Sequence, residues 1–338
     1  MTSHHPDNER IKRAYFVYLR EAKGMSEVSI DQIAKAISRF ETFNRNRDFK
    51  AFHIEQPKAF KKHLAEQRSQ RTSEPLSHAT IYSTLSALKS LFYWLADRPG
   101  YKSRISYGDA DYFSMNMKDA RIAKTVRETK VPTLEQIRHV LRSMPAETDI
   151  KRRDRALIAF IILTGARDGA VASFKLKHID LDKNLLEQDA REVRTKASKS
   201  FPTIFFPVGD DVRTIVSDWI VYLRTERLFG FNDPLFPASL VDLGPDRKFR
   251  ANGLDRRHWT NAGPIRKIFK EAFARAGLPY FNPHSFRKTL AQLGQKICRT
   301  PEAMKAWSQN LGHADMMTTF SSYGTLSRGQ QTEIMGAL

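Results

Sequence analysis

Tyr323 is the residue near the carboxyl end whose chemistry most needs an explanation. It stands ten positions after His313, in the segment LGHADMMTTFSSYG of residues 311–324. We expect one helix to end at Leu311 and Gly312, and a second, short helix to follow that Asp315 caps and Gly324 stops. A tyrosine in the last turn of such a helix either packs against neighbouring side chains or offers its phenolic oxygen as a nucleophile. This segment alone leaves both interpretations open.

His284 and Arg287 form a second pair whose spacing has chemical meaning. They occur in NPHSFRKTLAQL, where Pro283 suits the first position of a helix and Asn282 can cap it. Positions i and i+3 then share one face of the first helical turn. The start of a helix presents unpaired N–H groups and the positive end of the dipole, which suits a phosphate. The alternative is an ordinary surface histidine beside an ordinary arginine.

Arg167 and two lysines complete the basic candidates. Arg167 directly follows an apolar helix expected over residues 155–166, so it should leave the core at a defined place. It either forms a salt bridge at the surface or has a function. Lys196 and Lys199 lie in the basic stretch REVRTKASKS, residues 191–200. That stretch predicts either a solvated hairpin tip or a tip that enters a DNA groove.

The composition indicates a nucleic-acid partner. The 338 residues include 56 Lys and Arg against 37 Asp and Glu, which gives a formal net charge of +19. A chain this basic is typical of proteins that bind a polyanion, and the alternatives are ribosome association or a merely solvated basic surface. The single cysteine, Cys298, excludes an internal disulfide and a cysteine-cluster metal site, and we expect it to be buried. The start of the chain lacks the apolar core of a signal peptide, and the longest apolar run is too short to span a bilayer. We therefore expect a cytoplasmic protein without membrane contact, nucleoid-associated if it is of bacterial or phage origin.

Two groups of elements should position these residues. The amino-terminal part has apolar residues at helical spacing and no alternating strands, which predicts a small all-α domain. Its expected helices lie over residues 11–26, 55–67 and 77–97, the last with Ser77 as the N-cap. Residues 101–131 lack sustained periodicity and predict a linker.

A second domain should begin with a capping box formed by Thr133 and Gln136. The apolar helix 155–166 follows, and two strand-like segments, 184–194 and 201–208, flank a basic turn. We expect the remainder to be helical. The expected starts, stops and breaks lie at Gly277, Pro283, Pro301 and Gly312.

Each signal is weak alone, but their order resembles the tyrosine recombinase (phage integrase) family. That family carries an arginine after an apolar helix, a lysine in a β-turn, a His-x-x-Arg pair, a Leu-Gly-His and a nucleophilic tyrosine. The matching positions are Arg167, Lys196, His284, Arg287, His313 and Tyr323. The resemblance covers nearly the whole chain, and TGAR, PHSFR and LGH match in order and in approximate spacing.

The resemblance implies a mainly α fold with a small β-sheet (α+β), in which an N-terminal helical core-binding (SAM-like) domain and a catalytic domain form a C-shaped clamp on DNA. The corresponding segments are 1–100 for the core-binding domain, 101–131 for the linker, 132–324 for the catalytic domain and 325–338 for a tail that docks on a neighbouring subunit.

The resemblance also implies a site-specific recombinase that cleaves and rejoins DNA through a covalent 3′-phosphotyrosine. Tyr323 would be the nucleophile, and Arg167 and Arg287 would neutralise the phosphoryl oxygens. Lys196 would be the general acid, with Lys199 as the fallback. His284 would assist proton transfer or contact the phosphate, and His313 would donate a hydrogen bond to a nonbridging oxygen. Neither ATP nor a metal is implied.

Double-stranded DNA recombination sites are the expected partner, bound by a dimer on one site and a tetramer on paired sites, with accessory DNA-binding proteins as further candidates. Helix 77–97 is one candidate for contacting the DNA backbone. The other candidate DNA-binding residues are Lys199, Arg247, Lys248, Arg250, Arg256 and Arg257. The alternative for residues 246–259 is a mobile loop whose charge merely solvates it.

Two departures from the family pattern leave alternatives open. The usual interval from the histidine to the tyrosine is nine positions, and Ser322 occupies that slot here. The family often has an acidic residue three positions after the first arginine, where this chain has Ala170; Asp168 is a possible substitute. A catalytically silent DNA-binding protein of the same fold, or an enzyme like a type IB topoisomerase, therefore remains an alternative.

Overall fold

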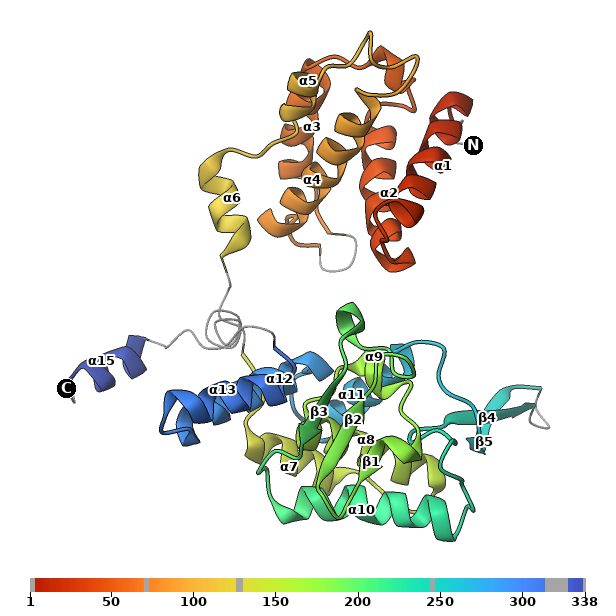
Figure 1. Cartoon of the computed structure of the whole chain (residues 1–338), viewed down its shortest axis with the longest axis vertical. Coiled ribbons are helices and arrows are strands. Elements are labelled where there is room, and N and C mark those ends of the chain that lie inside the picture. The colour runs from red at the N-terminus through yellow and green to blue at the C-terminus, as the bar shows by residue number, and fades with distance from the viewer. Residues whose placement is uncertain (1–3, 70–72, 126–129, 244–246, 314–327, 337–338) are drawn as a thin grey trace. The chain divides into compact units, whose positions relative to one another are not determined.

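A computed structural model describes residues 4–69, 73–125, 130–243, 247–313 and 328–336 of the chain. The chain divides into two compact units, Met1–Arg127 and Glu128–Leu338 (Figure 1). In the described part of the chain, no helix is long and apolar enough to cross a membrane.

The first unit is all helical, as the sequence predicts. Its elements are α1 (Pro6–Glu21), α2 (Glu27–Phe43), the 3-10 turn η1 (Phe49–Ala51), α3 (Glu55–Glu66), α4 (His78–Leu95), α5 (Tyr107–Asp111) and α6 (Met117–Lys124). Ser77 caps α4 as expected, because its side chain accepts a hydrogen bond from the Thr80 amide at 3.2 Å. Edge-to-face aromatic contacts organise the core: the Phe40 ring meets the Phe60 ring at a centroid distance of 5.2 Å and the Phe113 ring at 5.4 Å.

The stretch 101–131, expected to be a linker, contains α5 and α6. Phe113 and Ile105 are fully buried in the core of the first unit, and α6 packs against α4. Helices of five and eight residues are too short to show a sustained helical period in the sequence, although Asn116 caps α6 in the usual way. The first compact unit therefore extends to Arg127.

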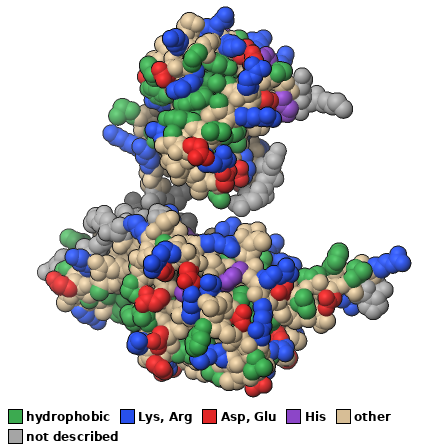
Figure 2. Space-filling view, turned by 45° about the vertical axis from the view of Figure 1, so that its right-hand side comes forward, with side chains coloured by type: hydrophobic (Ala, Val, Ile, Leu, Met, Phe, Trp, Pro, Cys, Tyr) green, Lys and Arg blue, Asp and Glu red, His purple; other side chains and the backbone are tan. Residues whose placement is uncertain are grey.

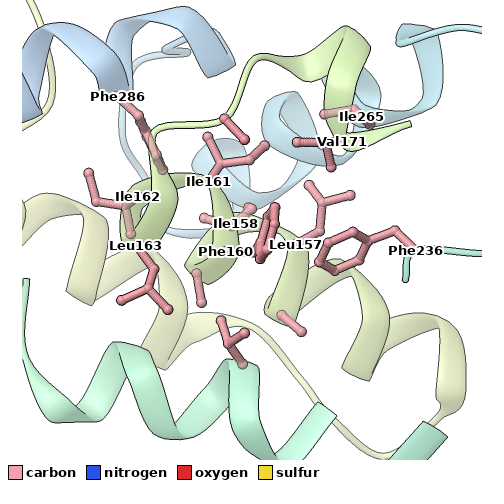
Figure 3. Close-up of a cluster of buried hydrophobic side chains, with 14 of the residues drawn as sticks. Leu157, Ile158, Phe160, Ile161, Ile162, Leu163, Val171, Phe236, Ile265 and Phe286 are labelled. Atoms are coloured by element: carbon pink, nitrogen blue, oxygen red, sulfur yellow. The ribbon is translucent and has the colours of Figure 1, made fainter. Parts of the chain in front are cut away.

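The second unit is built around α8 (Asp149–Thr164), which packs against α7 (Leu134–Ser143), α10 (Asp210–Thr225), α11 (Gly263–Arg275) and α12 (Pro283–Ile297). Figure 3 shows Leu157, Phe160 and Ile161 on α8 surrounded by side chains from the neighbouring elements. The expected capping box forms at the start of α7, where Thr133 and Gln136 exchange bonds of 3.1 and 2.9 Å. Residues 156–163 of α8 are apolar on every side, so this part of the helix must lie inside the domain.

A small antiparallel sheet flanks this helical core in the order β1-β2-β3. Its strands are β1 (Ile179–Asp180), β2 (Leu185–Gln188) and β3 (Phe201–Ile204), and β2 pairs with β3 from Gln188↔Phe201 to Leu185↔Ile204. This pairing confirms the two strands and the basic connection predicted between them. The remaining short elements are α9 (Asp168–Val171), η2 (Leu176–His178), η3 (Lys196–Ser198), α13 (Pro301–Asn310) and α15 (Arg328–Gly336).

A second hairpin corrects the expectation that the rest of this unit is helical. The strands β4 (Ala238–Leu243) and β5 (Phe249–Asp255) pair antiparallel and project from the body of the second unit (Figure 1). Their facing pairs Val241↔Ala251 and Leu243↔Phe249 put apolar side chains on one face, and the Phe249 residue is 78% exposed. Only the base of the hairpin packs on the core, through Ala238 and Leu254, and the outer part is exposed on both faces, so the strands lack the buried-and-exposed alternation that reveals a strand in a sequence.

Candidate active site

The carboxyl end of α8 sets the position of Arg167. Gly165 ends the helix in the left-handed region, with φ at +61°, and a Cβ there would lie 3.1 Å from side-chain atoms of Leu290 and Leu311. Only glycine fits that turn comfortably. Arg167 follows two residues later as the N-cap of α9, so a buried helix end and a short helix determine where its side chain begins.

Arg287 is buried rather than exposed, with an exposed fraction of 2%. Its Nη1 atom donates to the Gly165 carbonyl and its Nη2 atom donates to the Leu311 carbonyl at 2.5 Å. The interpretation of His284 and Arg287 as an ordinary surface pair is therefore wrong for the arginine. The predicted cap of α12 is confirmed, since the Asn282 side chain accepts a bond of 3.1 Å from the Ser285 amide. One guanidinium group thus joins the end of α8 to the turn that follows α13.

His313 lies in that turn with an exposed fraction of 8%. Its Nε2 atom is 3.1 Å from Nη2 of Arg287, and its amide donates to the Ser308 carbonyl at 3.1 Å. Gly312 has φ at +70°, and a Cβ there would lie 2.3 Å from the Phe201 ring. Gly312 is therefore required for two reasons: its backbone is left-handed, and a side chain there would collide with Phe201 of β3.

Asn310 ties β3 to the end of α13. Its side chain pairs with the backbone of Ile204 in both directions, accepting at 2.7 Å and donating at 2.8 Å. Lys196 lies in η3, in the connection between β2 and β3, and it is exposed. The sheet, the lysine connection and the His313 turn therefore belong to one hydrogen-bonded assembly.

Positive charges converge on the two histidines. Burial lowers the pKa of His313 to about 4, with further contributions from Arg287, Arg167, His284 and Lys196. The pKa of His284 also falls to about 4, first through desolvation and then through Arg287, Lys288 and Arg167, although the residue as a whole is exposed. Both imidazoles are neutral at pH 7. The structure brings together five of the predicted residues: Arg167, Lys196, His284, Arg287 and His313.

Ala170 and Asp168 show how α9 differs from the family pattern. Ala170 is buried, with an exposed fraction of 2%, so it contributes packing at the position where an acidic residue is common. Asp168 accepts a bond of 2.8 Å from Nε of Arg266 on α11 and a bond of 2.9 Å from the Gly169 amide. The carboxylate therefore fastens α9 to α11 beside the predicted phosphate site.

The predicted DNA-binding residues of the second hairpin fall into two groups. Arg247, Lys248 and Arg250 are exposed at and near the outer end of the β4–β5 hairpin. Arg256 instead pairs with Asp233 at 3.3 Å and donates to the carbonyls of Arg227 and Leu228, and Arg257 pairs with Asp255 at 2.5 Å. Arg256 therefore has a structural role at the base of the hairpin. Lys199 is exposed in the β2–β3 connection.

Tyr323 and Ser322 lie outside the described residues, as does the short helix expected after Asp315. Within residues 4–69, 73–125, 130–243, 247–313 and 328–336, no group of three or more His, Cys, Asp or Glu side chains is arranged to hold a metal ion. Cys298 is only partly buried, so the expectation of a buried cysteine is corrected; it follows the last turn of α12, where the helix reaches the surface.

Sequence reasoning missed the residues that hold this assembly together. Arg194, Glu192 and Ser173 fasten the β2–β3 connection to the domain, and Asn310 fastens β3 to α13. The only signal available for Arg194 and Glu192 was their place in a charged stretch, which also fits a solvated turn. Polar anchors of this kind bind backbone groups far away in the sequence, so no local pattern marks them.

Family models and curated relatives match both units of the chain. Residues 130–328 match the model of the phage integrase family, and residues 13–99 match the phage integrase N-terminal SAM-like domain. The chain is 26% identical over 240 residues to tyrosine recombinase XerD of Neisseria meningitidis serogroup B, covering 70% of this chain and 68% of that protein. It is 22% identical to tyrosine recombinase XerC of Pseudomonas putida, covering 92% and 90%.

A solved structure has the same fold. A lambda integrase fragment, crystallised as a dimer bound to a COC′ core site, superimposes with a TM-score of 0.62 at 16% identity, covering 95% of this chain and 96% of that one. The chain therefore belongs to the phage integrase family. It is a tyrosine-type site-specific recombinase, as the order of its motifs predicted.

Proposed function

We propose that this recombinase cleaves and rejoins DNA strands through a covalent bond between Tyr323 and the 3′-phosphate of the cut strand. The phenolic oxygen attacks phosphorus, and the bond from phosphorus to the 5′-oxygen breaks. The 5′-hydroxyl of a partner strand later attacks the phosphotyrosine and restores a phosphodiester. The number of phosphate ester bonds is conserved, so the exchange needs no nucleotide hydrolysis.

The observation that carries this proposal is the buried Arg287 with its fixed partners. Bonds to the Gly165 and Leu311 carbonyls hold the guanidinium before any substrate arrives. Arg167 contributes positive charge at the same place, since it lowers the pKa of both His284 and His313. Preorganised donors of this kind act on the charge that develops on the phosphoryl oxygens, and one donor is worth roughly 3–4 kcal/mol in the transition state. Because Arg287 is already in place, the protein does not have to rearrange when the charge develops on the phosphate.

The remaining residues handle protons. Lys196 gives its proton to the departing 5′-oxygen, which otherwise leaves as a poor, strongly basic group. His284 is neutral and able to accept the proton that Tyr323 loses. His313 is oriented by Arg287 and donates a hydrogen bond to a nonbridging oxygen. Lys199 stays the alternative general acid.

Double-stranded DNA containing a recombination site is the proposed partner, and a dimer on each site is the proposed assembly. The net charge of +19 supports DNA binding, and the lambda integrase structure above is a dimer on a core site. Figure 2 shows Lys and Arg side chains spread over the visible surface of each unit. The outer end of the β4–β5 hairpin and helix α4 are the proposed backbone contacts, and nucleoid association follows from DNA binding. Tetramers on paired sites, accessory proteins and docking of the carboxyl-terminal tail on a neighbour are also proposed.

A suicide duplex tests this function directly. The protein is incubated with its recombination site carrying a nick that lets a short fragment diffuse away, and covalent adducts are separated under denaturing conditions. We expect an adduct with wild type and with Ser322→Ala, no adduct with Tyr323→Phe, and a nucleotide mapped to Tyr323 by mass spectrometry. An adduct of unchanged yield in Tyr323→Phe contradicts the proposal. Recombinant product from paired sites, rather than relaxed plasmid alone, separates strand exchange from a topoisomerase reaction.

A further inference from the structure

Arg194 holds the connection that carries Lys196 against the body of the second unit. Its Nη1 atom donates to the Thr260 carbonyl at 2.7 Å and its Nη2 atom donates to the Trp259 carbonyl at 3.1 Å. Trp259 is itself buried, with an exposed fraction of 6%, and the Arg153 guanidinium lies 4.9 Å from its ring centroid. The two carbonyls are therefore a firm point of attachment just before α11.

The backbone of Arg194 makes a second attachment, to the helix that Arg167 begins. The Arg194 amide donates to Oγ of Ser173 at 3.0 Å, and that hydroxyl donates to the Ala170 carbonyl at 2.9 Å. A Cβ on Gly169 would lie 3.9 Å from the Arg194 carbonyl oxygen, an ordinary van der Waals distance, so α9 and the connection are neighbours. Ser173 thus sets the distance between the segment of Arg167 and the segment of Lys196.

Glu192 attaches the same segment on its other side. Its carboxylate lies 2.9 Å from Nζ of Lys175 and 2.8 Å from Nζ of Lys177. Between Glu192 and Arg194, Val193 is buried in the hydrophobic core. Residues 192–194 are therefore held by two ion pairs, a core side chain and a guanidinium, and Lys196 lies two positions after Arg194.

We propose that Arg194 is a positioning residue for the general acid: its bonds to the Trp259 and Thr260 carbonyls place the Lys196 ammonium at the departing 5′-oxygen. Both terminal nitrogens of Arg194 donate to protein carbonyls, so we assign its effect to the placement of Lys196 rather than to a contact with the phosphate. The inference rests on the proposed role of Lys196. A flexible lysine side chain gains most from such an anchor, because its ammonium would otherwise sample many positions.

The test compares Arg194→Ala with Arg191→Ala. Arg191 is an exposed arginine of the same connection that pairs with Asp189 at 2.6 Å, inside the connection itself, so its loss removes the same charge and no attachment. Each protein cleaves two suicide duplexes, one with the normal 5′-oxygen and one with sulfur in that bridging position. Sulfur leaves without a proton, so the second duplex does not need the general acid.

We expect Arg194→Ala to cleave the oxygen duplex about 10- to 100-fold more slowly than wild type, the cost of a small misplacement of a catalytic group. On the sulfur duplex it should match wild type, and Arg191→Ala should match wild type on both. Equal losses on both duplexes would mean structural damage or a phosphate contact, and would overturn the inference. Wild-type rates on the oxygen duplex would overturn it as well.

Two further variants separate this inference from the proposed function. Lys196→Ala must be rescued by sulfur; if it is not, Lys196 is not the general acid, and the inference fails with that assignment. If Lys196→Ala is rescued and Arg194→Ala is not, only the role of Arg194 is overturned. The double variant that combines Lys196→Ala with Arg194→Ala should cleave the oxygen duplex no more slowly than Lys196→Ala alone. Without the Lys196 ammonium, the loss of Arg194 has no general acid to displace. If the rate losses of the two single variants instead multiply in the double variant, the two residues act independently and Arg194 does not act through Lys196.

Discussion

The Nη2 atom of Arg287 lies 3.1 Å from the Nε2 atom of His313. A guanidinium group has only donors, so this nitrogen of the imidazole must accept and carry no proton. The remaining ring proton therefore sits on Nδ1, and the ring is neutral. The same arginine enforces this state electrostatically, because its charge contributes, after burial, to the lowering of the His313 pKa to about 4.

Arg287→Lys should abolish most of the strand cleavage. A lysine has one nitrogen where the arginine binds through two, so it cannot keep the bonds to the Gly165 and Leu311 carbonyls and the His313 ring and still donate to the phosphate. We expect cleavage of a suicide duplex to fall by about 100-fold or more. DNA affinity should change much less, since many phosphate contacts share the binding. Arg167→Ala should likewise lose strand cleavage while keeping most of its DNA affinity. Unchanged cleavage in both variants would refute the proposed arginine pair.

The neutral histidines predict an acid-sensitive fold. The pKa of His313 is about 4 in the folded chain and near 6.5 when it is unfolded, so the unfolded chain binds more protons between these values. The free energy of unfolding should therefore fall as the pH drops from 6.5 towards 4. For His313 the slope is at most about 1.4 kcal/mol per pH unit. Urea unfolding of wild type and His313→Gln at pH 7 and pH 5 measures this, and the variant should lose less stability on acidification.

Gly312→Ala should be more damaging than its backbone angle alone explains. Gly312 and Gly277 both have left-handed backbones, with φ at +70° and +69°. A Cβ at Gly277 meets nothing within 4 Å, whereas a Cβ at Gly312 lies 2.3 Å from the Phe201 ring. We expect Gly277→Ala to lower the free energy of unfolding by about 1 kcal/mol. Gly312→Ala should lower the free energy of unfolding by about 1–3 kcal/mol more than that, because the overpacked Phe201 ring or the backbone must shift. It should also reduce strand cleavage, because the shift moves His313. Equal stabilities of the two variants would exclude the close approach of Phe201.

Lys196 and Lys199 can be separated by the leaving group. The charge of Lys196 contributes to the low pKa of His313, which supports Lys196 as the lysine that faces the phosphate. Lys196→Ala should lose about 100-fold or more on a 5′-oxygen duplex and recover on a 5′-sulfur duplex. Lys199→Ala should cleave both duplexes at the wild-type rate and should lose no more than some DNA affinity. Recovery seen only with Lys199→Ala would reverse the assignment.

DNA affinity should fall steeply with salt, because each neutralised phosphate releases counterions. Lys248→Ala, near the outer end of the β4–β5 hairpin, should reduce the slope of log affinity against log salt by about one. Arg256→Ala should leave that slope unchanged and instead lower the free energy of unfolding, because Arg256 binds Asp233 and two carbonyls. Binding titrations at several salt concentrations, with urea unfolding alongside, distinguish these outcomes. A flat salt dependence of the wild type would contradict DNA binding through the basic surface.

Local sequence was enough to predict the caps and the order of the motifs. Asn282 caps α12 and Thr133 closes a capping box, because each of these bonds joins residues three positions apart. The glycine of the Leu-Gly-His segment could be seen to break a helix for the same local reason. The family followed from residue types in a given order, which requires no knowledge of how the helices pack.

Tertiary structure alone decided which of those residues meet and how they are held. Arg287 binds carbonyls that lie 122 and 24 positions away, and Arg194 binds carbonyls 66 and 65 positions away. No periodicity encodes such pairs, because they depend on how α8, α12 and α13 pack rather than on the residues beside each arginine. The β4–β5 hairpin escaped prediction for the opposite reason: the outer part of its strands faces no core, so burial left no alternating pattern in the sequence.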